Sequence, residues 1–67
     1  MVIHEWLVIY HPPGNKGSRQ WITEAMTLGQ AERLAKRQLR LSAHSLKIVA
    51  RRTRDVLTNK RTEWQPI

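Results

Sequence analysis

The sequence contains no cysteine, no phenylalanine, a single tyrosine and only five acidic residues among its 67. Without cysteine, the chain can form neither disulfides nor thiolate metal sites, and it has no cysteine nucleophile. The longest apolar run, residues 6–10, is far too short to span a bilayer. The first residues show neither the basic segment nor the small-residue cleavage site of a signal peptide. These absences predict a cytoplasmic protein.

Residues that support catalysis are also few and scattered. The acids are not spaced so that two of them pair, and His4, His11 and His44 lack the spacing of metal ligands. No glycine-rich phosphate loop follows a strand, and no serine stands in a nucleophile motif. A chain of this length also has little volume for a closed pocket. We therefore expect no enzymatic activity, no metal and no cofactor.

Positive charge is the most prominent feature that is present. Twelve Lys and Arg residues against five acids give a formal net charge of +7 and a pI near 11.3. Such a balance favours an anionic partner. With 40% hydrophobic residues the composition is that of a globular protein, and the length allows a single domain over residues 1–67 with a small core.

Two strands are expected in the first third of the chain. Residues 3–11 are rich in β-branched and aromatic types, and their apolar run covers both faces, which is typical of a central strand. Prolines and glycines interrupt this pattern over residues 12–18, and β character resumes over residues 19–25. The two segments predict an antiparallel hairpin.

A helix is expected next, from about Leu28 to Arg40 or Leu41. Thr27 is a good N-cap, and Gln30 completes a capping box. A loop over residues 42–45 then leads to a strand over residues 45–52. The helix positions expected against the sheet are Leu28, Ala31, Leu34, Ala35 and Leu39. The positions expected to meet them are Trp6, Val8, Leu46 and Ile48, with Ala50 on the same face as Leu46 and Ile48.

The last segment allows two interpretations. Residues 56–64 form either a fourth strand or hairpin that turns at Asn59-Lys60, with Trp64 packing back, or a short helix capped by Asp55. We favour the strand. The element order is then β-β-α-β with a further β. The predicted fold is α+β, a small antiparallel sheet with one amphipathic helix packed on one face.

The tryptophans are core residues or stacking platforms for bases. Trp6 and Trp21 lie in the middle of strands, where core packing is the simpler interpretation and base stacking the alternative. The core role is favoured for Trp6, whereas Trp64 is balanced between the two roles. The aromatic and glycine cluster of RNA-recognition sheets is absent, which weighs against an aromatic RNA platform.

The basic residues fall into two clusters. The first is a helical stripe at i, i+3, i+4 and i+7, formed by Arg33, Lys36, Arg37 and Arg40. The second follows the third strand and consists of Arg51, Arg52 and Arg54, with Lys60 and Arg61 nearby. The simpler interpretation of these clusters is a charged, solvent-exposed face that keeps the chain soluble. A surface on which acids alternate with the basic residues would, however, serve solubility better. The planar guanidinium group of arginine can form two parallel hydrogen bonds with a phosphate or a carboxylate, so we favour a binding role for the stripe.

Part of the sequence also resembles a known family of small proteins. The stretch ITEAMTLGQAERLAKRQLR, followed by SLKIVA, resembles the ninth type I-F anti-CRISPR family of small phage proteins. In that family a strand ending in Glu-Ala leads to a Ser-Leu cap, a short basic helix beginning Gln-Ala, and strands ending near a Trp. The matching residues here are Glu24, Ala25, Thr27 in place of Ser, Leu28, Gln30, Ala31, Arg33, Ala35 and Arg37, with Lys60, Arg61 and Trp64 in the last strand.

The resemblance implies an antiparallel sheet with one helix. It also implies stoichiometric binding to the backbone subunits of a CRISPR surveillance complex, in competition with target DNA. Arg33 and Arg37 fall on basic contact positions, while Glu32 stands where that family has a lysine. The expected partner is thus an anionic or nucleic-acid-binding protein surface, and the alternative is DNA or RNA bound directly by a small regulatory module. No membrane partner is expected.

Overall fold

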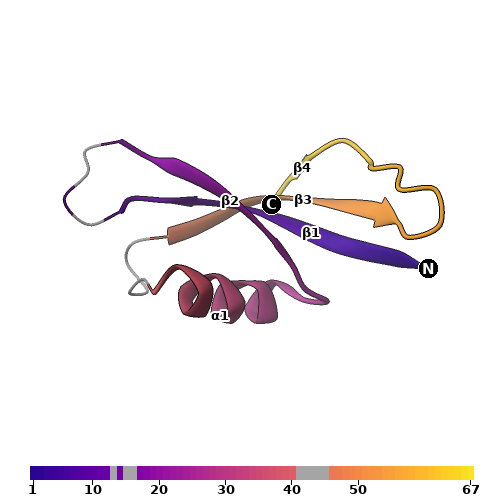
Figure 1. The fold of residues 1–67 in the computed structure, drawn as a ribbon. Coiled ribbons are helices and arrows are strands. Elements are labelled where there is room, and N and C mark those ends of the chain that lie inside the picture. The colour runs from indigo at the N-terminus through magenta and orange to yellow at the C-terminus, as the bar shows by residue number, and fades with distance from the viewer. Residues whose placement is uncertain (13, 15–16, 41–45) are drawn as a thin grey trace.

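A computed structural model describes residues 1–12, 14, 17–40 and 46–67. It contains β1 (Val2–Tyr10), β2 (Arg19–Glu24), α1 (Leu28–Leu39), β3 (Leu46–Asp55) and β4 (Gln65–Pro66). The strands form one antiparallel sheet in the order β2-β1-β3-β4, and α1 lies along one face of it (Figure 1). The predicted α+β architecture is confirmed.

The first strand is central, as its two-sided apolar run predicts. It pairs with β2 on one side, with Leu7 opposite Ile22, and with β3 on the other. The predicted hairpin of the first two strands is therefore confirmed. The connecting loop expected at residues 12–18 lies partly outside the described residues, and the loop expected at residues 42–45 lies wholly outside them.

The helix begins and ends close to the predicted residues. The Thr27 hydroxyl accepts a hydrogen bond from the Gln30 backbone N–H at 3.2 Å. The Gln30 side chain accepts one from the N–H of Met26 at 2.8 Å, one residue earlier than a standard capping box. After Leu39 the chain turns at Arg40, whose φ of 53° is left-handed and whose N–H donates to the Lys36 carbonyl.

Small residues bring the helix onto the sheet. Ala31 and Ala35 are fully buried, and Val8 of the central strand is fully buried beside them. Trp6 is 4% exposed and its indole Nε1 donates to the Ala25 carbonyl at 2.9 Å, so its predicted core role is confirmed. Leu28 lies toward the sheet as predicted, because it lines surface hollows with Trp6, Leu46 and Ile48, but 43% of its surface remains exposed.

A β-bulge interrupts the regular alternation predicted for the third strand. Val8 is opposite Ile48, but Leu7 is opposite Ala50, so β3 carries an extra residue at this point. Successive residues of β1 face opposite sides of the sheet. Ala50 therefore lies on the face away from α1, and the prediction that it shares a face with Ile48 is wrong.

The tail after β3 folds back as a hairpin rather than as a helix. The Asp55 carboxylate accepts hydrogen bonds from the N–H groups of Leu57 and Thr58, and Asn59 has a left-handed φ of 61°. The chain then returns along β3, with Thr62 donating to the Thr53 carbonyl and β4 pairing with residues 50–51. A hairpin with a further β segment is confirmed, but β4 is Gln65–Pro66 and so lies just beyond the predicted residues 56–64, within which Arg61 makes an isolated bridge to Arg54.

Candidate functional site

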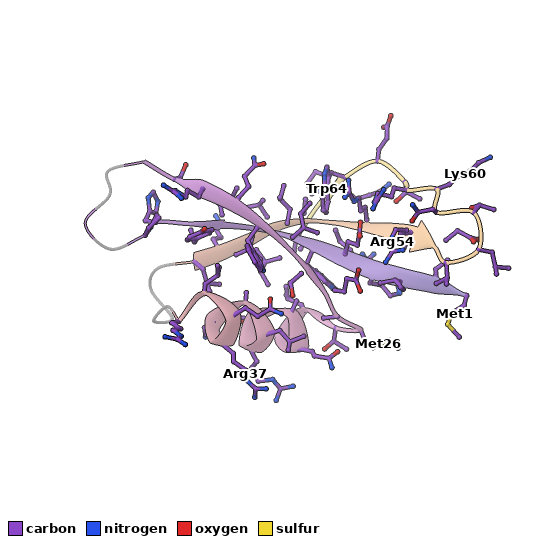
Figure 2. The ribbon with its side chains drawn as sticks, viewed as in Figure 1. Met1, Met26, Arg37, Arg54, Lys60 and Trp64 are labelled. Atoms are coloured by element: carbon purple, nitrogen blue, oxygen red, sulfur yellow. The ribbon has the colours of Figure 1, made fainter. Side chains whose placement is uncertain are left out.

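The helical basic stripe is brought together on the surface of α1. Arg33 and Arg37 are exposed, and with Gln30 and Leu34 they line a shallow hollow of about 240 Å³. Figure 2 shows Arg37 extending from the helix on the side away from the sheet. Within the described part of the chain, neither arginine forms an ion pair. Both guanidinium groups are thus free to bind an external anion.

The other two residues of the stripe have local roles as well. The Lys36 ammonium lies 3.1 Å from a Glu32 carboxylate oxygen, an i,i+4 pair on a partly exposed surface. Such pairs are worth little, so Lys36 remains available at small cost. Arg40 caps the helix at its C-terminal end, where positive charge is favourable to the helix dipole. Of the four basic residues in the stripe, Arg33 and Arg37 therefore contribute least to holding the fold together.

The second predicted cluster is divided between the two faces of the sheet. Arg51 is opposite Trp6 on the helix side, and its guanidinium lies 5.7 Å from the centre of the Trp6 ring. Arg52 and Arg54 are opposite Glu5 and Ile3, on the face away from α1. The seven predicted binding residues therefore do not form one continuous surface.

A buried carboxylate organises the arginines of that second face. Glu5 is 4% exposed, and its oxygens lie 2.6 Å from Arg52 Nε, 3.3 Å from Arg54 Nε and 3.4 Å from Arg61 Nε. The Arg54 guanidinium also reaches Glu24 Oε1 at 2.9 Å. We call Glu5, Arg52, Arg54 and Arg61 the Glu5 network. Its arginines neutralise an internal charge, which gives them a structural role.

The electrostatics of Glu5 follow from these contacts. Burial raises the pKa of the Glu5 carboxyl, but hydrogen bonds and charge from Arg52, together with Arg61 and Arg54, outweigh burial and lower the pKa below its ordinary value of 4.5. Glu5 is therefore ionised at neutral pH. Sequence reasoning missed it, although an acid within an apolar central strand is a signal that a buried cation must lie nearby.

The network also holds the C-terminal tail. The Arg52 guanidinium stacks on the Trp64 ring at 4.1 Å from its centre, so Trp64 packs back onto the sheet as expected (Figure 2). Trp64 is half-buried, and Arg52 lies between its ring and Glu5. This arrangement joins the last segment to the central strand.

The described residues contain no group of three or more histidine, aspartate or glutamate side chains that could hold a metal ion. No helix in the described ranges is long and apolar enough to cross a membrane. No family model, curated protein or solved structure matches the chain.

Proposed function

We propose that this chain is a non-catalytic binding protein that docks onto an anionic or nucleic-acid-binding macromolecular surface through Arg33 and Arg37, with Lys36 and Arg40 at the margin. The observation that carries the proposal is the exposure of these two arginines on one side of α1, without an ion pair to any described residue. A surface on which acids and bases alternate keeps a protein soluble more effectively, so solubility alone does not account for this gathering of positive charge.

The hollow between the two arginines suits a recognition role. Arg33 and Arg37 are one helical turn apart, so both planar forks can approach a single carboxylate or phosphate or two neighbouring ones. Gln30 adds an amide and Leu34 adds apolar surface to the same hollow. Arginine is enriched among the residues that dominate binding energy when it lies near the centre of an interface.

The partner that we propose is a CRISPR surveillance complex, which the chain inhibits by occupying a surface needed for target binding. This choice rests on the sequence resemblance, in which Arg33 and Arg37 match basic contact positions. Direct binding of DNA or RNA is the second candidate, because a net charge of +7 favours any polyanion. Binding to a protein assembly and direct binding to a nucleic acid depend differently on salt concentration and on nuclease treatment, so one experiment distinguishes the two candidates.

The test compares two charge-matched double variants of the full chain. In one, Arg33→Glu and Arg37→Glu reverse the face of α1, and in the other Lys47→Glu and Lys60→Glu reverse two exposed lysines elsewhere. We expect the helix variant to keep its circular dichroism spectrum and to lose about thirtyfold or more in affinity, as befits central interface arginines. The lysine variant should lose much less, although the net charge changes equally.

Each variant is titrated against a nuclease-treated CRISPR surveillance complex and against bare duplex DNA over a range of salt concentrations. A saturable, stoichiometric complex with the assembly that depends on the helix face supports the inhibitor. Binding to bare DNA alone, with affinity falling steeply with salt, supports the second candidate. Full binding by the folded helix variant, or equal losses in both variants, would show that the stripe is only a solvated face.

A further inference from the structure

The outer edge of β2 carries unpaired backbone groups. β2 is the terminal strand of the sheet, and the N–H of Ala25, just after it, donates to the His4 carbonyl of β1 at 3.1 Å. In an antiparallel strand the backbone groups of successive residues alternate between its two sides. The odd-numbered residues of β2 therefore face β1. Gln20, Ile22 and Glu24 direct their N–H and C=O groups outward, where no described residue pairs with them.

This edge also has few of the features that usually prevent pairing, because its two charged residues, Arg19 and Glu24, stand only at the ends of the strand. β2 has the sequence RQWITE, with no proline, no lysine and no bulge against β1. Its central side chains are large and apolar, and 38% of Trp21 and 46% of Ile22 are exposed. The opposite edge differs, because β4 has only two residues and one of them is Pro66. One edge is thus blocked and the other is open to a further strand.

We propose that a second copy of this chain pairs with β2 through its own β2, in antiparallel orientation about a two-fold axis perpendicular to the sheet. In that geometry a residue whose backbone groups point outward from one β2 pairs with a residue of the same kind in the other β2. The register in which Gln20, Ile22 and Glu24 all find such a partner sets Ile22 opposite Ile22 of the second copy and Gln20 opposite its Glu24. Each such pair exchanges both of its backbone hydrogen bonds.

The side chains of β2 complement one another in this register. The two Ile22 side chains meet on the face away from α1 and cover apolar surface that is exposed in one copy. Gln20 lies across from a Glu24 carboxylate, to which its amide can donate a hydrogen bond. On the helix side, Trp21 of each copy lies across from the Thr23 of the other. No like charges are opposite each other, so self-pairing carries no electrostatic penalty at the strand.

The small core gives this association a physical reason. Of the large side chains only Val8 is fully buried among the described residues, and much of the rest of the core is alanine. A chain with so little buried apolar surface gains from covering more of it by self-association. Because the axis is perpendicular to the sheet, both α1 helices lie on the same side of the joined sheet. The two basic stripes then face the same direction, which allows two-site binding to an extended anionic partner.

The test measures association of the full chain by analytical ultracentrifugation from low micromolar to near-millimolar concentrations. Ile22→Lys places a charge at the centre of the edge. Val56→Lys is the matched control, because Val56 is also β-branched and 42% exposed but lies in the turn after β3. We expect a wild-type dimer whose dissociation constant rises about tenfold or more in Ile22→Lys, while Val56→Lys changes it little.

Amide hydrogen exchange of the wild-type chain provides a second readout that needs no variant. The amides of Gln20, Ile22 and Glu24 should exchange more slowly as concentration rises, whereas those of Trp21 and Thr23 are already bonded to β1 and should change less. A chain that stays monomeric throughout would overturn the proposal. So would a dimer that survives Ile22→Lys, or one in which the outward-facing amides gain no protection. Pairing of β2 with an extended peptide but not with a second copy would also overturn it.

Discussion

Replacing Glu5 with glutamine tests whether the Glu5 network contributes to stability as its geometry implies. Glu5→Gln keeps the size of the side chain but removes the charge that three arginines share. The side chains of Arg52 and Arg54 are only 18% and 19% exposed, so water can replace the carboxylate only in part. Removing one partner of a fully buried pair costs about 3–5 kcal/mol.

The expected loss here is somewhat smaller than for a fully buried pair. The arginines keep some contact with water, Arg54 still has Glu24, and the glutamine oxygen can accept one of the lost hydrogen bonds. We therefore expect Glu5→Gln to lower the free energy of unfolding by about 2–4 kcal/mol. For a small domain this is a large share of the total stability.

Urea denaturation followed by circular dichroism measures this loss as a fall in the midpoint with an unchanged slope. Glu24→Gln is the matched control, because Glu24 pairs with the same Arg54 but its side chain is 53% exposed. Its cost should stay below about 1 kcal/mol. Similar losses in the two variants, or a loss in Glu5→Gln below about 1 kcal/mol, would refute the argument that burial makes the Glu5 network strong.

The acid sensitivity of the Glu5 network and the packing of α1 on the sheet can each be tested with a single variant. Because the pKa of Glu5 is lower in the folded chain than its ordinary 4.5, its contribution is present above that value and is lost as the pH falls through the folded pKa. The wild-type urea midpoint should thus fall more steeply than that of Glu5→Gln on acidification below pH 4.5, and parallel curves would contradict this. Ala35→Leu should cost about 1–3 kcal/mol, because Ala35 is fully buried between α1 and the sheet. Gly29→Ala is its control, since nothing lies within 4 Å of the added Cβ, and equal stability of both variants would show that the helix contact is loose.

The elements whose signals are local could be predicted from the sequence. The helix N-terminus depends on Thr27 and Gln30, which lie within one turn of each other. The strand character of β1 and β2 is carried by their own residues, and the turn residues between them favour direct antiparallel pairing. The spacing of Arg33 and Arg37 is likewise fixed as soon as the helix is assigned.

Features that depend on distant residues could not be predicted. The bulge in β3 exists because of its register against β1, and periodicity within residues 45–52 carries no sign of it. Glu5 meets Arg52 across 47 positions of sequence, so its place in an apolar strand indicates that a cation lies nearby but not which residue supplies it. For this reason sequence patterns place Arg51, Arg52 and Arg54 in a binding surface, although the structure shows that Arg52 and Arg54 of β3 neutralise a buried acid.

The arginines of this chain therefore divide by environment, although the sequence presents them as one excess of charge. Arg52 and Arg54 have a buried carboxylate within hydrogen-bond distance, so their reversal to glutamate would place like charges beside Glu5 and unfold the sheet. Arg33 and Arg37 have no such partner, so their reversal should change binding and leave the fold intact. Loss of binding after a change at Arg52 or Arg54 would consequently report lost structure. Only variants of the exposed face of α1 test directly what the positive charge of this protein is for.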